Sequence, residues 1–161
     1  MSVAIVWFRR DLRLADNPAL AAARAAGHEI LPLFIHAPDE EAPWQPGAAS
    51  NWWLHHALVD LSARLDGRLL IRRGRSLDTL RELIAASGAV AVYWNRLYEP
   101  AAIARDTAVK QGLRADGVTA SSHNAALLFE PWELATRQGD PYRVFTPFWK
   151  RLLEFGLPHP E

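Results

Sequence analysis

The chain contains no cysteine and no long apolar run. None of its 161 residues is Cys, which excludes disulfides, Cys-ligated zinc and a catalytic thiol. No apolar stretch approaches the roughly 20 residues of a membrane span, and the amino terminus lacks the pattern of a secretory signal peptide. We therefore expect a cytoplasmic protein that is not inserted in a membrane.

The chain also has no net charge, because 18 Lys and Arg balance 18 Asp and Glu. A neutral domain has no overall field that attracts nucleic acid, so a DNA contact would need a local patch or another domain. The length and the 50% hydrophobic content are typical of one domain with one core.

Several catalytic and nucleotide-binding motifs are missing as well. The segment after the first apolar run reads FRRDLRL, without the glycines that let a backbone approach a pyrophosphate, so the sequence argues against a Rossmann dehydrogenase. No P-loop, nucleophile elbow or motif of paired carboxylates is present. We therefore predict a binding domain with no catalytic residue and no metal site of its own.

Short apolar runs typical of strands alternate with helical patterns along the chain. We expect strands at residues 3–8, 28–35, 68–71, 89–94 and 118–121, and helices at 19–26, from 50, at 76–87, from 99 and at 148–155. Asn17-Pro18 and Ser50 supply the expected helix caps. This alternation predicts an α/β fold: a single domain with a doubly wound, Rossmann-like, five-stranded parallel sheet and helices on both faces.

In such folds ligands bind outside the carboxyl ends of the strands. The expected site is therefore formed by residues 9–11 after the first strand, by Phe34 and His36 at the end of the second, and by residues 95–99 after the fourth.

Arg9, Arg10 and Arg13 have two interpretations. They could bind an anion, or they could form a structural salt-bridge cluster with Asp11 and Asp16 that closes the first loop. Judged on these residues alone, the cluster is favoured.

Two further groups of residues also have more than one interpretation. Asn95 and Glu99 could contact the polar edge of a ligand or serve as helix caps. The tryptophans at 52, 53 and 149 are expected in the core or between domains, because a light-dependent role would need a bound chromophore.

Three segments resemble the DNA photolyase and cryptochrome family. WFRRDLRLADNPAL at 7–20, AVYWNRLYEP at 91–100 followed by Arg105-Asp106, and PYRVFTPFWK at 141–150 occur in the family's order and with near-family spacing. The resemblance covers essentially the whole chain, which is identified as a member of the family through its amino-terminal domain.

The resemblance implies a function in light-driven DNA repair. In this family the amino-terminal domain holds an antenna chromophore that passes excitation to reduced FAD in a helical domain, and FAD then donates an electron that splits a pyrimidine dimer. Residues 1–135 would be the antenna-binding domain, residues 136–161 a carboxyl-terminal helix and the start of an interdomain linker, and the FAD domain would be absent from this chain.

The first expectation is therefore a class I deoxyribodipyrimidine photo-lyase that cannot repair DNA without its FAD domain. Its partners would be that domain and damaged DNA, and the complete protein would be a monomer. A cryptochrome photoreceptor is the related alternative. A free-standing nucleotide-binding or interaction module is the third, and it would not expose an apolar interdomain face.

The resemblance also implies the antenna and its residues. Methenyltetrahydrofolate is the common antenna of the family and 8-hydroxy-5-deazaflavin the less common one. By position, Asn95 and Glu99 match the antenna-contacting segment, with Glu99 placed to bond a pterin-like ring. Cleft-lining positions correspond to Arg9, Arg10 and Phe34; Asn51 stands where the family often has a basic residue; and Lys150 would touch the DNA backbone.

Overall fold

The computed structural model describes residues 2–136 and 138–156, in two compact units. Met1–Ala125 form an α/β unit and Ala126–Glu161 a carboxyl-terminal unit. The predicted start of a linker at 157–161 lies outside the described residues. The assignment of residues 1–135 to one domain stays a prediction.

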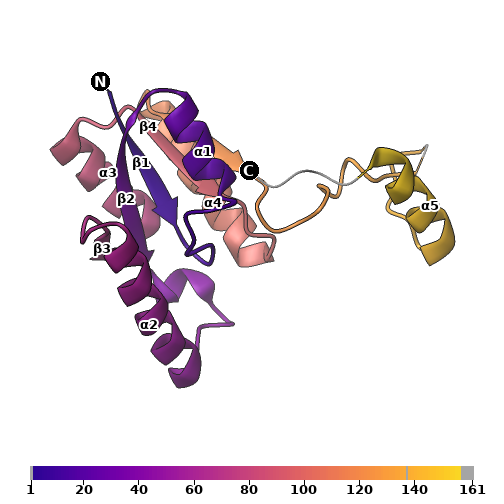
Figure 1. Cartoon of the computed structure of the whole chain (residues 1–161), viewed down its shortest axis with the longest axis horizontal. Helices are drawn as coiled ribbons and strands as arrows, with labels where there is room; N and C mark the ends of the chain where they lie inside the picture. The colour runs from indigo at the N-terminus through magenta and orange to yellow at the C-terminus, as the bar shows by residue number, and fades with distance from the viewer. Residues whose placement is uncertain (1, 137, 157–161) are drawn as a thin grey trace. The chain divides into compact units, whose positions relative to one another are not determined.

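The α/β unit contains one parallel sheet of five strands in the order β3-β2-β1-β4-β5 (Figure 1). The strands are β1 (Val3–Phe8), β2 (Glu29–His36), β3 (Leu70–Arg73), β4 (Ala91–Asn95) and β5 (Thr119–His123). The chain leaves β1 toward β2 on one side and returns to β4 on the other, so the strand order reverses between β1 and β4. The predicted α/β class, the five parallel strands and the doubly wound arrangement are confirmed.

Helices cover both faces of the sheet, as predicted. They are α1 (Pro18–Ala25), α2 (Ala48–Arg64), α3 (Ser76–Ser87) and α4 (Pro100–Ala115), and the carboxyl-terminal unit contains α5 (Phe145–Phe155). No helix in the described part of the chain is long and apolar enough to cross a membrane.

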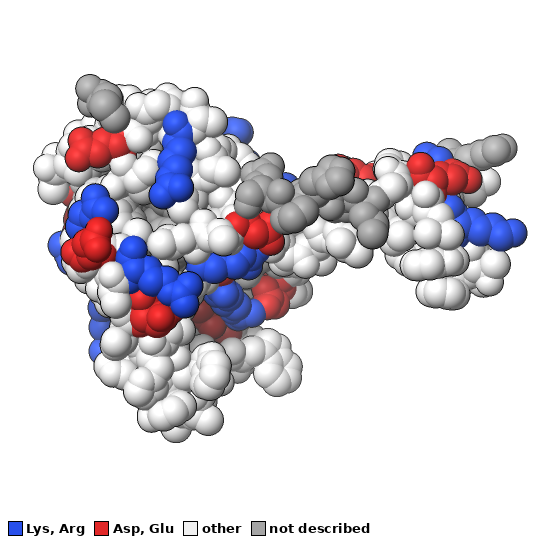
Figure 2. All heavy atoms as spheres, in the orientation of Figure 1, with Lys and Arg blue, Asp and Glu red and all other residues white. Residues whose placement is uncertain are grey.

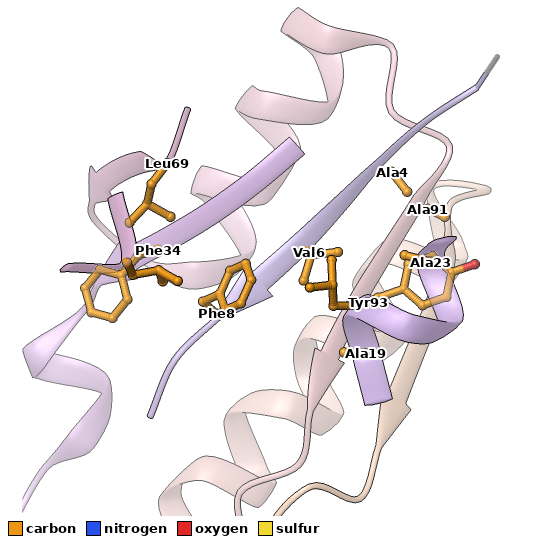
Figure 3. Packing of buried hydrophobic residues seen from close by; sticks show 11 residues of the cluster. Ala4, Val6, Phe8, Ala19, Ala23, Phe34, Leu69, Ala91 and Tyr93 are labelled. Atoms are coloured by element: carbon orange, nitrogen blue, oxygen red, sulfur yellow. The ribbon is translucent and has the colours of Figure 1, made fainter. Parts of the chain in front are cut away.

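Alternation along the strands sends side chains into two separate core layers. One layer packs Val6 and Phe8 of β1 against α1 and α2, where Leu61 is fully buried. Figure 3 shows Phe8 and Phe34 close together in this layer. The opposite layer packs Trp7 and its neighbours against α3 and α4.

Helix α1 begins as its sequence predicts. The Asn17 side chain accepts a hydrogen bond from Leu20 N at 3.2 Å, and Pro18 occupies the first helical position. The side chain of Asn95, at the end of β4, accepts a second bond from the buried amino-terminal end of this helix, from Ala19 N at 3.1 Å. Helix α1 is therefore fixed to the carboxyl end of the sheet from two directions.

Several predicted boundaries differ from those of the structure; β4 begins and β5 ends two residues later than expected. Helix α2 is capped by Gly47 in an extended conformation, and Ser50 lies inside its first turn. Strand β3 begins two residues later than expected, because its pairing with β2 determines which residues enter the sheet. Helix α5 begins at Phe145, before the predicted start at 148, with Pro147 in the first turn, where the missing N–H needs no helical partner.

A buried ion pair joins β1 to α4 beneath the carboxyl edge of the sheet. Arg9 Nη1 donates to both carboxylate oxygens of Asp106, at 2.8 and 2.7 Å, and Arg9 Nη2 donates to the backbone oxygen of Asn95. The two side chains are 6% and 13% exposed. Burial lowers the pKa of Arg9, while the charge of Asp106 and its hydrogen bond oppose the change. The pair fixes the backbone just before the expected site.

We expect Asp106→Asn to destabilise the α/β unit strongly. Removing one partner of a buried pair leaves an uncompensated charge, at a cost of about 3–5 kcal/mol, and urea unfolding would show this loss. The matched control is Asp116→Asn, which breaks an exposed pair with Arg81 and should change the unfolding free energy little. Equal losses of unfolding free energy in both variants would show that burial does not make the Arg9–Asp106 pair more important for stability than an exposed pair.

Candidate functional site

A cleft opens at the carboxyl edge of the sheet, beside the point where the strand order reverses. It consists of two adjoining hollows of about 190 and 470 Å³, which we call the inner and the outer hollow. Both hollows are lined by Arg10, Glu41, Leu97 and Arg105. This is the edge at which parallel α/β sheets bind ligands.

The inner hollow is mainly apolar at its base. Trp7 and Phe34 come from the ends of β1 and β2, and Leu54 comes from the first half of α2. Among the described residues, Arg9 Nε is buried and has no hydrogen-bond partner, and Glu41 Oε2 is buried with only the ion pair to Arg10 at 3.5 Å. A buried polar atom without a hydrogen bond costs about 1–3 kcal/mol. An apolar hollow with such polar atoms in its wall fits a planar aromatic ligand with a polar edge.

The outer hollow is formed by the loop after β2 and by the start of α4. Trp44 projects from the loop with 86% of its surface exposed, and Glu99 stands at the amino-terminal end of α4. The exposed Trp44 ring offers a surface on which a flat ligand can stack. Pockets for drug-sized ligands hold roughly 300–1,000 Å³, so the outer hollow alone, at about 470 Å³, has room for such a ligand.

Arg10 lies between the two hollows. It forms ion pairs with Glu99 and, at 3.5 Å, with Glu41. The Arg10 side chain is 54% exposed and that of Glu99 is 51% exposed. Exposed pairs contribute little to stability, so both side chains can exchange this partner for a ligand at small cost.

The electrostatics of the cleft keep Glu99 ionised. Partial burial alone would raise the pKa of Glu99, but backbone hydrogen bonds and the positive charge of Arg10 outweigh it, so the pKa is lowered from its ordinary value of 4.5. Glu99 is therefore a carboxylate acceptor at neutral pH. Across the α/β unit, acidic and basic side chains alternate without a large patch of one sign on the face shown in Figure 2.

The structure brings four of the predicted antenna residues to this cleft. Arg9, Arg10 and Phe34 line the inner hollow, and Arg10 and Glu99 line the outer one. Arg9 is also held by the buried ion pair with Asp106, so its charge is already balanced within the fold. Of the arginines near the first loop, Arg13 follows the structural interpretation, because it pairs with Asp16 at 3.7 Å.

The other two predicted antenna residues, Asn95 and Asn51, do not line the cleft. The Asn95 side chain is 3% exposed and donates to Asn17 Oδ1 at 2.8 Å and to Asp11 Oδ2. Its amide therefore holds the first loop and α1, and it lines neither hollow. Asn51 is exposed and donates to Pro46 O at 3.1 Å, and only its neighbours Pro46 and Ser50 line the inner hollow.

Lys150 belongs to the carboxyl-terminal unit, on helix α5. It is exposed and lines a shallow hollow of about 420 Å³ together with Tyr142 and Arg151. A DNA contact at Lys150 stays a prediction.

Sequence reasoning missed several residues of the cleft: Trp7, Trp44, Glu41 and Arg105. Arg105 was noted only as part of a family landmark. Trp7 falls in an apolar strand, where alternation gives no sign that its ring reaches the edge. Trp52 and Trp53 are 62% and 71% exposed, so they do not lie in the core, and their expected place between domains stays a prediction.

The described residues, 2–136 and 138–156, contain no group of three or more His, Asp or Glu side chains arranged to hold a metal ion. The cleft itself combines an apolar floor, one exposed aromatic ring, that of Trp44, and carboxylate and guanidinium groups at the rim.

Known proteins match this chain over almost the whole of its own length. The family model "DNA photolyase" matches residues 4–161. The deoxyribodipyrimidine photo-lyase of Agrobacterium fabrum is 48% identical over 158 residues, which are 96% of this chain and 32% of that protein. Cryptochrome-1 of Arabidopsis thaliana is 45% identical over 92% of this chain and 22% of its own length.

A comparison with solved structures gives the same family. The class III photolyase of Agrobacterium tumefaciens superposes with a TM-score of 0.84 and 46% identity, over 96% of this chain and 32% of that one. This similarity does not support the expected class I. The chain spans about a third or less of the length of these relatives. Together with the parallel sheet and its edge cleft, these matches show that the chain belongs to the DNA photolyase family, whose amino-terminal domain it represents.

Proposed function

We propose that the α/β unit binds the antenna chromophore of a light-driven deoxyribodipyrimidine photo-lyase. The single observation that carries this proposal is the two-part cleft at the carboxyl edge of the sheet. It combines an apolar floor, an exposed aromatic ring and an ionised acceptor in one place. Membership of the family supports a ligand that absorbs light.

Each part of the cleft would have a distinct task. Phe34 and Leu54 would contact a planar ring in the inner hollow, and Trp44 would stack on the part of the ligand in the outer one. Glu99 would accept a hydrogen bond from the ring's polar edge, and Arg10 would hold that carboxylate in place. The bound chromophore would absorb light and supply excitation energy.

Methenyltetrahydrofolate is the first candidate and 8-hydroxy-5-deazaflavin the second. The carboxylate of Glu99 suits a pterin-like ring, which carries N–H donors on one edge. The deeper apolar hollow suits the tricyclic ring of a deazaflavin. In both cases the residues present fit the ligand.

Catalysis would belong to the whole protein. The photo-lyase activity would require an FAD domain, to which this chain would be joined, and damaged DNA would be a partner of the complete, monomeric, cytoplasmic protein. Lys150 is the candidate for a non-specific contact with the DNA backbone, sensitive to salt. A cryptochrome is the second candidate, favoured by the 45% identity to a plant cryptochrome.

We expect the purified chain to retain a chromophore. After incubation with methenyltetrahydrofolate or 8-hydroxy-5-deazaflavin and desalting, the chain should keep a near-ultraviolet or blue absorption band. Glu99→Ala should weaken binding roughly 10- to 150-fold, because a hydrogen bond to a charged group contributes about 1.5–3 kcal/mol. Equilibrium titration of the absorption band measures this change.

The control is Glu82→Ala, which removes an exposed carboxylate on α3 away from the cleft. It should bind like the unchanged chain. Equal affinity of the Glu99→Ala variant would refute the role of Glu99, and failure to retain either chromophore would refute antenna binding by this chain. Retention of ATP instead would favour a nucleotide-binding module.

The lowered pKa of the Glu99 carboxyl group leads to a further prediction. Its pKa is lowered in the folded chain, so ionised Glu99 favours the folded state above pH 4.5, and this contribution is lost as the pH falls through the lowered value. A carbon-13 titration of the Glu99 carboxyl by NMR should have its midpoint below 4.5. Arg10→Gln should move the midpoint upward, because Arg10 supplies part of the shift. A midpoint at or above 4.5 in the unchanged chain would contradict this description of the cleft.

A further inference from the structure

A pair of buried tryptophans lies directly behind the inner hollow. Trp7 lines the hollow from the end of β1, and Trp94 on the neighbouring strand β4 packs against it with ring centres 6.1 Å apart. Both rings are almost fully buried, at 2% and 1% exposure. A chromophore bound in the inner hollow would therefore share a wall with Trp7.

A tryptophan in contact with an antenna chromophore can quench its excited state. Indole is among the most easily oxidised side chains, and Trp7 can donate one electron to an excited aromatic ring in contact with it. The electron then returns, both partners end unchanged, and the excitation is lost as heat. An antenna site with a tryptophan in its wall must suppress this transfer.

Positive charges surround the tryptophan pair. The guanidinium carbon of Arg9 lies 4.8 Å from the centre of the Trp7 ring, and that of Arg105 lies 5.3 Å from it. On the other side, Lys110 Nζ lies 6.0 Å from the centre of the Trp94 ring. A nearby cation attracts the electron-rich face of an indole but repels the positive charge that forms when the indole loses an electron.

The negative charge nearby only partly offsets these cations. Asp106 pairs with Arg9 at 2.7 Å and with Arg105 at 2.9 Å. One carboxylate thus faces two guanidinium groups, and the Trp7 ring remains in a positive environment. Arg105 is only 10% exposed, so water screens its charge weakly.

The indole N–H groups add a second barrier. Nε1 of Trp7 and Nε1 of Trp94 are buried and have no hydrogen-bond partner. An oxidised indole is a strong acid that is stabilised by passing its proton to a neighbouring acceptor. Within the described part of the chain, neither N–H has such an acceptor in hydrogen-bonding reach, so these residues do not stabilise the oxidised state by taking its proton.

We propose that Arg9 and Arg105 protect the excited antenna by making Trp7 a poor electron donor. The proposal rests on the proposed function of the cleft. In it, Arg105 protects the excited chromophore as well as lining its binding site. Arg9 is fixed by the fold, whereas Arg105 lines both hollows and can be changed while Asp106 keeps its pair with Arg9.

The test is the fluorescence lifetime of 8-hydroxy-5-deazaflavin bound to the chain, excited at wavelengths that indole does not absorb. Arg105→Gln should shorten the lifetime roughly twofold or more, because loss of a charge at about 5 Å lowers the cost of oxidising Trp7. The double variant with Trp7→Phe should restore the long lifetime, since the donor is then missing. This rescue separates electron donation from a general change in the cleft.

Two control variants complete the series. Arg105→Lys keeps a positive charge and should keep the long lifetime, and Arg114→Gln removes an exposed charge from the same helix and should have no effect. Thermal unfolding by circular dichroism checks that each variant is folded. An unchanged lifetime in Arg105→Gln, or a short one that Trp7→Phe does not restore, would overturn the protective role alone. If the unchanged chain retains neither the deazaflavin nor methenyltetrahydrofolate, both this role and the proposed function are overturned.

Discussion

The arrangement of the cleft depends on the buried ion pair between Arg9 and Asp106. This pair joins the end of β1 to α4, and a further bond from Arg9 reaches the backbone of Asn95 at the end of β4. Asn95 in turn holds Asp11 in the first loop and the start of α1. The two central strands and two helices are thus tied together at the edge where the strand order reverses. Arg10 follows Arg9 in the chain, so fixing Arg9 also places Arg10 between the two hollows.

The same constraint gives neighbouring residues different tasks. Arg9 is buried and its charge is balanced by Asp106, while Arg10 is exposed and paired at the rim with Glu99. Asn95 supports the loop, while Glu99, four residues later, is a half-exposed, ionised acceptor at the rim. The residues that support the site are therefore separate from those free to contact a ligand, and a ligand can bind without breaking the supporting bonds.

Sequence reasoning predicted the fold well and the cleft in part. Alternating apolar runs and the Asn17-Pro18 cap predict the strands, the helices and their order, because these signals are local. The same reasoning placed Phe34 and Glu99 at the site, because the ends of parallel strands meet at one edge. It could not distinguish Asn95 from Glu99, since the partners of Asn95 are 76 to 84 residues away in the chain. The positions of Trp44 and Arg105 likewise depend on packing between distant segments.

The central claim is that the cleft at the carboxyl edge of the sheet binds a light-absorbing ligand. The most direct measurement is an NMR titration of the isotope-labelled chain with methenyltetrahydrofolate and, separately, with 8-hydroxy-5-deazaflavin. The account predicts saturable changes that are largest at the backbone amides of Arg10, Leu97 and Glu99, and none at Lys150. Changes confined to α5, or no saturable change with either ligand, would contradict it.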